Sequence, residues 1–479
     1  MPNHVAVHIL TLGCPKNEVD SDRMAATLAG AGHALADELD GAQVAVVNTC
    51  AFIQDATEQS IETVLALAGE WKAAESGRLL VVAGCMASRY AQDLPAELPE
   101  VDAFVPVADE AAIAEVLRGL LTRADTAGTE PEAPGKAFAG PSGPARRSET
   151  SESGASGSVL RTTPGPSAYL MVSDGCFREC AFCTIPSIRG PYRSRAAVDL
   201  LLEARMLAAG GARELVLIGQ DTSAYGRDLD PTQGPRDLAG IVRMLSATPD
   251  GALGVPGLDW LRLMYVQPDG LTDELLEAMA SSPAVAHYLD LPLQHASTRV
   301  LRAMRRTGSA DSFLALLGRI RAVLPDVRLR TTLIAGFPGE TDADIEILLE
   351  FLEAARFDYV GVFAYSPEEG TEAFTLPGQL PDTERTARAQ LVSDAGEAIG
   401  SDRVLDLVGD TLDVLVEAAD EDGVASSTGG PAWVGRWRGQ APEIDGVVYF
   451  DGDARPGSIV SVSIVDAFGY DLIGEVAER

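Results

Sequence analysis

The sequence predicts an α/β protein in which two successive sets of parallel strands and helices are followed by a C-terminal part of alternating strands. Runs rich in Val, Ile and Leu alternate with helical patterns through most of the 479 residues. This alternation is typical of buried parallel strands joined by helices. A change of composition over residues 123–160 separates the two sets. We therefore expect structured parts at residues 1–122, 161–397 and 398–479.

Three apolar runs in the N-terminal part each end at a cysteine, namely Cys14, Cys50 and Cys85. Helical patterns follow the runs, most clearly at residues 55–68, and repeated βα units predict a small doubly wound domain. The carboxyl ends of parallel strands meet at one edge of such a sheet, so we expect the three thiols to lie close together. Helix N-termini at that edge favour thiolates. Three cysteines at equivalent strand ends thus indicate metal ligation rather than three small apolar core residues.

Residues 123–160 differ from the rest of the chain in composition. They are rich in Ala, Gly, Pro, Ser, Thr and Glu, and Phe138 is the only large apolar residue between 124 and 158. Such a segment cannot bury enough apolar surface to offset the entropy lost on ordering it. We expect a flexible linker that connects two cofactor-bearing domains.

The second set of strands predicts an incomplete βα barrel with six parallel strands. Strand candidates lie between Tyr169 and Tyr365, with helical patterns between them, for example at residues 197–209 and 312–324. In barrels of this kind the chemistry gathers at the C-terminal ends of the strands. The polar and aromatic residues expected at those ends, some of them only packing or turn residues, are Gln220, Asp221, Tyr265, Gln267, Gln294, His295 and Tyr365.

The first strand of this set leads into the motif Cys176-x3-Cys180-x2-Cys183. Three thiolates so close in sequence suit a soft metal or an iron–sulfur cluster better than a disulfide framework. A tetrahedral zinc site needs four ligands, and no fourth Cys or His lies nearby in the sequence. The triad is therefore one ligand short, and a cubane held by three cysteines leaves one iron free to bind another molecule.

The bulk properties restrict the class of protein. A formal net charge of −34 argues against a general nucleic-acid binder, which needs a basic face. The charge fits a basic partner, a high-salt proteome or simply solubility. We see no apolar run of about 18 residues and no secretory signal, so we expect a cytoplasmic protein without a membrane span.

The motif resembles the radical S-adenosylmethionine superfamily. The resemblance rests on the cysteines of residues 176–183 at the end of the first barrel strand, and on an aromatic residue directly before the third cysteine. It implies that the three cysteines hold a [4Fe–4S] cluster whose open iron binds S-adenosylmethionine, which is then cleaved to methionine and a 5′-deoxyadenosyl radical. It assigns cofactor contacts to Phe182, Gly219, Gln220 and Gly336.

The upstream cysteines narrow the resemblance to the methylthiotransferases of that superfamily. It implies that Cys14, Cys50 and Cys85 hold a second [4Fe–4S] cluster, which handles the sulfur to be inserted, while a second S-adenosylmethionine donates the methyl group. Residues 398–479 resemble the TRAM module, a small β-barrel. The linker at residues 123–160 is the main departure from the family pattern.

Two substrate classes exist in this family, and local motifs favour one of them. They resemble the branch that modifies the β-carbon of an aspartate in the small-subunit ribosomal protein numbered twelve. Residues 400–479 carry 16 Asp and Glu against five Arg and no Lys, which suits a basic protein better than tRNA. The motifs are Ser173-Asp-Gly, Ile185-Pro-Ser-Ile-Arg-Gly190, Gln220-Asp-Thr-Ser-Ala-Tyr-Gly226, Pro292-Leu-Gln-His-Ala-Ser297 and Ala441-Pro-Glu-Ile-Asp-Gly446.

The expected partners are therefore that ribosomal protein and an electron donor such as flavodoxin or ferredoxin, with no tRNA. Two alternatives stay open. One is methylthiolation of a modified adenosine in tRNA. The other is a non-enzymatic metal- or iron–sulfur-containing RNA-binding protein, which explains the cysteines but not the polar strand ends of the barrel.

Overall fold

A computed structural model gives the fold of the chain. It describes residues 4–126, 137–138, 161–230, 232, 234–246, 254–421, 423–424 and 432–477. The chain forms two compact units. The first comprises Met1–Pro164, Gly175–Phe177 and Cys183–Pro191, and the second comprises Gly165–Asp174, Arg178–Phe182 and Tyr192–Arg479.

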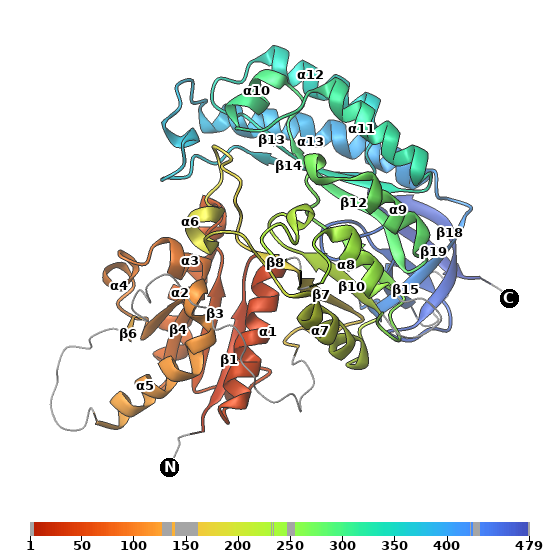
Figure 1. The fold of residues 1–479 in the computed structure, drawn as a ribbon. Helices are drawn as coiled ribbons and strands as arrows, with labels where there is room; N and C mark the ends of the chain where they lie inside the picture. The colour runs from red at the N-terminus through yellow and green to blue at the C-terminus, as the bar shows by residue number, and fades with distance from the viewer. Residues whose placement is uncertain are drawn as a thin grey trace. The chain divides into compact units, whose positions relative to one another are not determined.

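The first unit is a doubly wound domain around one parallel sheet (Figure 1). The strand order is β2-β1-β3-β4-β5-β6. The central strand β3 is buried along its whole length, as its continuous run of β-branched residues predicts. The strands are β1 (Ala6–Thr11), β2 (Ala34–Leu35), β3 (Val44–Thr49), β4 (Leu79–Gly84), β5 (Ala103–Pro106) and β6 (Ala137–Phe138).

Helices cover both faces of this sheet and give it two hydrophobic cores. Met24 and Leu28 of α1 (Pro15–Gly30) share one core with Ile113 of α5 (Ile113–Thr126). The other core contains apolar residues of α2 (Gln54–Ala66), α3 (Cys85–Arg89) and α4 (Leu94–Glu97). It also takes Ile188 from α6 (Ile185–Arg189), so the segment that follows the third cysteine of the motif is part of this unit.

The second unit begins with an open sheet of six parallel strands in the order β14-β13-β12-β11-β10-β7. A short antiparallel pair, β8 (Ser173–Asp174) with β9 (Arg193–Ser194), follows its first strand. The sheet strands are β7 (Ser167–Met171), β10 (Glu214–Ile218), β11 (Trp260–Leu263), β12 (Val285–Gln294), β13 (Arg328–Ala335) and β14 (Tyr359–Ala364).

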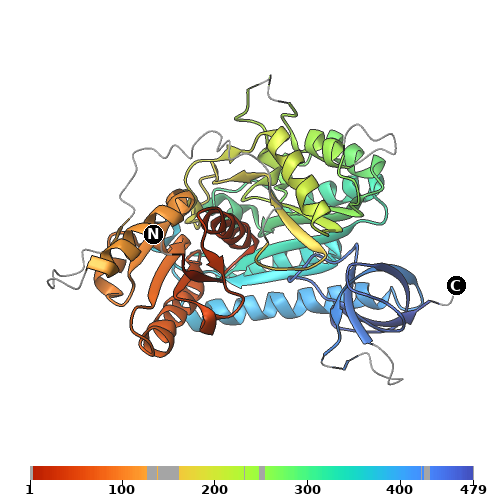
Figure 2. The ribbon, with the colours of Figure 1, turned by 90° about the horizontal axis from the view of Figure 1, so that it is seen from below.

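Helices pack along the outside of this sheet, with contacts between α7 and α8, α8 and α9, α9 and α11, α11 and α12, and α12 and α13 (Figure 1). Side chains cap the starts of several of them: Asp237 accepts from Gly240 N, Thr272 from Leu275 N and Ser309 from Ser312 N. Figure 2 shows the long helix α13 lying beside β14 and reaching the closed barrel. The helices are α7 (Ala197–Ala209), α8 (Leu238–Leu245), α9 (Asp273–Ser281), α10 (Thr298–Ala303), α11 (Ala310–Val323), α12 (Asp342–Ala355) and α13 (Asp382–Leu405).

The C-terminal strands close into a small barrel in the order β15-β16-β17-β19-β18. Its strands are β15 (Thr411–Ala419), β16 (Ala432–Trp437), β17 (Val448–Asp451), β18 (Ile459–Phe468) and β19 (Asp471–Val476). Short helical turns complete the chain at η1 (Leu39–Gly41), η2 (Leu67–Lys72), η3 (Val107–Ala112), η4 (Thr222–Ala224), η5 (Pro268–Gly270) and η6 (Ala373–Thr375).

Buried charges join the small barrel to the N-terminal ends of the βα strands. Glu214, the first residue of β10, accepts from Arg262 of β11 at 2.7 Å and from Arg436 of β16 at 2.6 Å, and all three side chains are at most 1% exposed. Burial alone would raise the pKa of Glu214, but the two guanidiniums outweigh it and lower this pKa to about 2. The ion pairs are therefore fully formed at neutral pH.

A second buried contact lies beside the first. Asp445 accepts from the Tyr288 hydroxyl at 2.7 Å and from Ala441 N at 2.8 Å, and its other oxygen lies 3.5 Å from Arg330 Nε. Burial raises the pKa of Asp445 to about 6, although Arg330 works in the opposite direction. The small barrel thus packs against the N-terminal ends of the βα strands through buried polar contacts and forms the floor of the βα barrel.

The predicted fold class is confirmed in all three parts, but one predicted strand is wrong. The alternation of apolar and polar residues in Leu405-Asp-Leu-Val-Gly409 predicts a strand, whereas α13 continues to Leu405 and a turn follows. Val404 and Leu407 are buried while Leu405 is half exposed, so the apolar pattern there has helical spacing.

Two further observations concern the edges of these parts. Most of the predicted linker, residues 127–136 and 139–160, lies outside the described residues, and Ala137–Phe138 pair with β5. Within the described part of the chain, no helix is both long and apolar enough to cross a membrane.

Candidate functional site

The three N-terminal cysteines follow neighbouring strands of the first sheet. Cys14 follows β1 and is the N-cap of α1, Cys50 comes directly after β3, and Cys85 follows β4 as the first residue of α3. Cys50 and Cys85 are buried and Cys14 is half-buried. None of the three forms a disulfide. The sheet therefore brings together the three thiols that the spacing predicted at one edge.

Glycines allow the backbone to approach closely at these strand ends. Gly13 has φ +100°, and a Cβ there would lie 3.2 Å from Cys50 Sγ and 2.6 Å from Cys50 Cβ. Gly84 has φ +92°, and a Cβ there would collide with the Asn48 side chain and lie 2.8 Å from the Thr49 carbonyl oxygen. Only glycine fits both the conformation and the space. The positions directly before Cys14 and Cys85 are thus shaped around the thiol cluster.

The thiols influence one another electrostatically. Burial raises the pKa of both Cys50 and Cys85, and the neighbouring thiol of Cys14 adds to this effect. The guanidinium of Arg189 lowers the pKa of both. The net effect favours the neutral thiols, so a metal or cluster that takes them as thiolates has to displace their protons.

Two buried asparagines support this cluster from α1 and β3. Asn17 donates to Asn48 Oδ1 at 3.2 Å and to the Thr49 carbonyl at 2.9 Å. Asn48 donates in return to the Asn17 carbonyl at 2.8 Å. The Cys14 thiol donates to Asn17 Oδ1 at 3.4 Å. The loops that carry Cys14 and Cys50 are thereby locked together.

Among the residues that the structure describes, no three His, Cys, Asp or Glu side chains are arranged to hold a single metal ion. Three soft ligands that each bind a different iron stand farther apart than three ligands of one ion. The all-thiol donor set is the one that iron–sulfur clusters use. The chemistry of these three cysteines thus fits an iron–sulfur cluster, and their role as its ligands stays a prediction.

The second cysteine motif occupies the loop between β8 and α6. All three of its cysteines are half-buried and free of disulfides. Cys176 N donates to the Gly190 carbonyl at 3.3 Å, and a Cβ at Gly175 would lie 2.6 Å from the same carbonyl oxygen. The start of the loop is thus held against its end.

Cys180 lies beside an arginine of the barrel rim. The Arg306 guanidinium comes within 3.8 Å of Cys180 Sγ and also donates to Gln267 Oε1 and, at 3.1 Å, to the Pro292 carbonyl. Gln267 was predicted at a strand end, whereas Arg306 was not. Arg306 lies in the loop after α10, three positions beyond its last residue, and no sequence pattern marks it.

The backbone is strained where these groups meet. Three of the five described non-glycine residues with positive φ lie here, Tyr265 at 58°, Gln294 at 72° and Arg305 at 56°; the others are Arg356, which ends α12, and Glu443. The pairing of β12 with β13 shifts register between Leu291 and Gln294, a stretch that contains Pro292. Such strain concentrates at functional sites, so these outliers support the prediction that the chemistry lies at this rim.

The predicted cofactor residues lie at the same ends of the strands. Gly219 follows β10, and a Cβ there would lie 2.7 Å from Ser173 Oγ. Gln220 donates to Asp174 at 3.4 Å. Phe182 packs against a cluster that contains Phe337 and Tyr365. Gly219, Gln220 and Phe182 therefore belong to one rim, and their contact with a cofactor stays a prediction.

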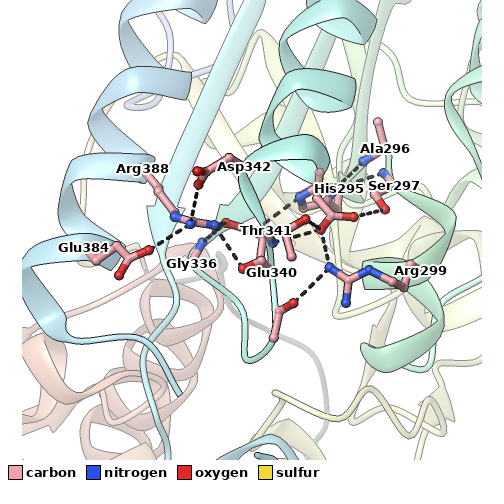
Figure 3. A network of polar contacts seen from close by, with 12 residues as sticks. His295, Ala296, Ser297, Arg299, Gly336, Glu340, Thr341, Asp342, Glu384 and Arg388 are labelled. Carbon is pink, nitrogen blue, oxygen red and sulfur yellow. Dashed lines mark hydrogen bonds and ion pairs between the residues drawn. The ribbon is translucent and has the colours of Figure 1, made fainter. Parts of the chain in front are cut away.

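Gly336 is held by a buried polar network (Figure 3). It has φ +81°, and its N–H donates to Glu340 Oε1 at 2.9 Å. Arg388 of α13 donates to the same oxygen at 3.1 Å. The other oxygen of Glu340 lies 3.3 Å from His295 Nε2, and both side chains are fully buried. The loop after β13 is therefore fixed by groups from β13, α13 and the end of β12.

These contacts also define the state of His295. Its Nδ1 accepts from Ala296 N and Ser297 N, both at 2.9 Å, so the proton of the neutral ring is on Nε2, facing Glu340. Ser297 Oγ donates to Asp344 at 2.6 Å, and Asp344 also accepts from Arg299 and caps α12 through Thr341. His295 thus acts within the protein as a link between loops (Figure 3).

One predicted motif lies elsewhere. In residues 441–446, Ala441 N donates to Asp445, and Asp445 accepts from Tyr288 at the floor of the βα barrel, away from the rim. No role was predicted for Arg189, which lies in the motif at residues 185–190, or for Glu340, which lies four positions after Gly336. Their partners are distant in sequence, which explains the omission.

Three family models match the chain. Residues 6–106 match the uncharacterized protein family UPF0004, residues 170–352 the radical SAM superfamily, and residues 408–477 the TRAM domain.

Curated relatives match along nearly the whole chain. The ribosomal protein uS12 methylthiotransferase RimO of Syntrophus aciditrophicus is 42% identical over 474 residues, which cover 98% of each chain. The proteins of that name from Symbiobacterium thermophilum (42%; 99% of this chain and 91% of the relative) and Geobacter sulfurreducens (40%; 98% of each) are similar to a comparable degree.

A solved structure shares the fold. The radical S-adenosylmethionine methyltransferase TsrM from Kitasatospora setae, with cobalamin and a [4Fe–4S] cluster bound, superposes with a TM-score of 0.52. The match covers 86% of this chain and 80% of that one at 13% identity. At this identity the likeness concerns the fold alone.

Proposed function

Because this chain belongs to the RimO family of radical S-adenosylmethionine methylthiotransferases, we propose that it attaches a methylthio group to the β-carbon of an aspartate in ribosomal protein uS12. The observation that carries the proposal is the identity of 42% over 98% of a relative whose name is ribosomal protein uS12 methylthiotransferase. Membership of the family makes the chain an enzyme that depends on S-adenosylmethionine and iron–sulfur chemistry.

The six cysteines then have separate roles in the proposal. Cys176, Cys180 and Cys183 hold the [4Fe–4S] cluster that binds S-adenosylmethionine, next to Phe182, Gly219, Gln220 and Gly336. Cys14, Cys50 and Cys85 hold a second cluster for the sulfur. When bound, these groups supply the radical that removes hydrogen from the aspartate, the sulfur that replaces it and the methyl group. The protein residues bind and orient these groups. The partner protein that donates electrons is flavodoxin, ferredoxin or a similar protein.

The surface charge of the C-terminal module supports a basic protein as the substrate. Arg403 pairs with Asp358, Arg436 with Glu214, and Arg438 donates to the Pro283 and Val285 carbonyls, so these cations are directed toward the βα barrel. The exposed acids of the module, in its described residues, are Asp402, Asp406, Asp410, Asp413, Glu421, Glu443, Asp453, Asp466 and Glu475.

A tRNA-binding module of the same fold needs the opposite arrangement, with its cations outside. An acidic outer face complements a basic ribosomal protein and accelerates the encounter. The charge argument is therefore stronger than the net charge alone, because Arg403, Arg436 and Arg438 are directed toward the βα barrel and Arg455 is the exposed arginine among the described residues of the module.

The test is mass spectrometry of small-subunit ribosomal proteins and of tRNA from cells with and without this gene. We expect uS12 from the deletion strain to be lighter by one methylthio group in place of hydrogen, with tRNA nucleosides unchanged. Reintroduction of the gene restores the heavier form. An unchanged uS12, together with the loss of a methylthiolated adenosine, would instead establish the tRNA activity.

A further inference from the structure

Arg189 is a buried cation beside the N-terminal thiols. It ends α6, and its side chain is 2% exposed. Its neighbour Ile188 packs in a hydrophobic core of the first unit, so the helix is held in place. A buried charge is costly unless it is paired and hydrogen-bonded. The position therefore requires a counter-charge.

One nitrogen of Arg189 faces three acceptors. Nη2 lies 2.8 Å from Asp20 Oδ2, 3.5 Å from Asn17 Oδ1 and 3.9 Å from Cys85 Sγ. Asp20 is itself 1% exposed and supplies the counter-charge. An ion pair with a purely structural purpose would be complete with Asp20 alone. The contact with a candidate cluster ligand is additional.

The contact has a known physical effect on iron–sulfur clusters. Hydrogen bonds to the ligand sulfurs and nearby positive charge stabilise the reduced, more negative cluster and raise its reduction potential. A nearby carboxylate acts in the opposite sense. Arg189 and Asp20 stand together at one edge of the thiol cluster, and their effects there have opposite signs.

We propose that Arg189 is a positioning residue for the N-terminal cluster. Arg189 donates an N–H···S hydrogen bond to the Cys85 thiolate and thereby raises the reduction potential of the cluster, and Asp20 is its buried counter-ion. The inference rests on the proposed second cluster. It gives a role to a residue six positions after Cys183, on the segment that carries the last ligand of the other cysteine motif.

The experiment isolates the N-terminal cluster. A full-length C176A/C180A/C183A protein is loaded with iron and sulfide, and its cluster is titrated with a low-potential reductant while the reduced state is followed by electron paramagnetic resonance. Arg189→Gln and Asp20→Asn are then compared in this background. We expect Arg189→Gln to shift the midpoint potential to more negative values and Asp20→Asn to shift it to more positive values.

The opposite signs separate this role from a structural one. If Arg189 and Asp20 only hold the fold together, each change breaks the same ion pair, so the two variants would lose cluster in parallel or shift the potential in the same direction. Either result would overturn the proposal. Arg189→Lys keeps the charge, so we expect it to retain the cluster with a potential closer to the parent than that of Arg189→Gln.

Two controls complete the design. Arg23 lies 3.8 Å from Asp20 and is 36% exposed, so Arg23→Gln weakens the same carboxylate pair at the surface and should leave the potential unchanged. If Arg189→Gln fails to hold a cluster, Asp20→Asn decides, because an unshifted potential there overturns the proposal. If the C176A/C180A/C183A parent binds no iron–sulfur cluster, the proposed second cluster is wrong. This outcome differs from a failure of the proposed role of Arg189, in which the cluster is present and its potential does not shift as expected.

Discussion

At the scale of single residues, the two cysteine triads are predicted to have separable functions. Changing Cys180 to Ala removes a ligand of the proposed radical cluster, so both 5′-deoxyadenosine formation and methylthiolation should be abolished. Changing Cys50 to Ala should leave reductive cleavage of S-adenosylmethionine at least partly intact while methylthiolation fails. Chromatography of 5′-deoxyadenosine and mass spectrometry of uS12 measure the two outcomes. A Cys50 variant that methylthiolates normally would refute the assignment of the N-terminal cluster.

Asp445 predicts a pH dependence of stability. Its pKa is about 6 in the folded protein against 3.8 for a free side chain, so the folded state holds the proton more tightly. Between these pH values the folded protein binds more protons than the unfolded chain, and the free energy of unfolding falls as the pH rises. The free energy of unfolding falls by about 3 kcal/mol between about pH 4 and about pH 6, and this loss is complete above about pH 6.

The variant Asp445→Asn has no carboxyl group at this position, so this pH dependence of the free energy of unfolding is absent. Its carboxamide oxygen can still accept from Tyr288 and Ala441, which share one oxygen of Asp445. Relative to the parent, its free energy of unfolding should therefore increase from about pH 4 to about pH 6 and then stay level. Denaturant unfolding, followed by tryptophan fluorescence at several pH values, measures this. For Asp453→Asn, at an exposed position of the same module, the free energy of unfolding should depend on pH as it does in the parent.

At the scale of elements, the strand-end glycines are expected to decide whether the N-terminal cluster forms. An alanine at Gly84 has an unfavourable φ of +92° and collides with Asn48 and the Thr49 backbone, so Cys85 or Asn48 must move. We expect Gly84→Ala to lower the free energy of unfolding by about 1–3 kcal/mol. It should also lose about half of the bound iron, that of the N-terminal cluster, as measured by iron and sulfide analysis after anaerobic purification. Gly69→Ala, with no atom within 4 Å of the new Cβ, should keep all of it.

The elements themselves were predictable where periodicity is strong. The runs that end at Cys14, Cys50 and Cys85 gave three strands of the first sheet, because continuous β-branched residues have few alternatives when buried on both faces. The short strand β5 (Ala103–Pro106) and the helix α13 were not predicted. The first has only four residues, and the second has little hydrophobic periodicity because much of it is exposed.

The site was predictable to the same extent. Sequence spacing identified the cysteines and the strand ends, since both are local patterns. Arg306, Glu340 and Arg189 act through partners about 40 to 170 positions away, and only the folded chain shows those pairs. Residues 441–446 served in the sequence only as a motif that resembles one branch of the family, and the structure shows that Asp445 is buried at the barrel floor.

At the scale of the whole molecule, the charge distribution predicts that ionic strength affects the encounter with the substrate and not the chemistry. The exposed acids of the C-terminal module attract a basic protein over distances that salt shortens. We expect kcat/KM for uS12 to fall about tenfold between low and high salt, while S-adenosylmethionine cleavage without uS12 stays constant. Replacing Asp402, Asp406 and Asp410 by Asn should flatten the salt dependence. A salt-independent kcat/KM would argue against electrostatic recognition.

The buried pairs between the small barrel and the βα strands also restrict how this protein can evolve. Glu214 has its partners Arg262 and Arg436 on two different parts of the chain, 222 positions apart in the case of Arg436. A module transferred from another family member without an arginine at position 436 would leave a carboxylate partly unmatched in the interior. We therefore expect positions 214, 262 and 436 to change together among homologues, while the exposed face of the module diverges freely. Domain shuffling, common for tethered modules, should be rare at this junction.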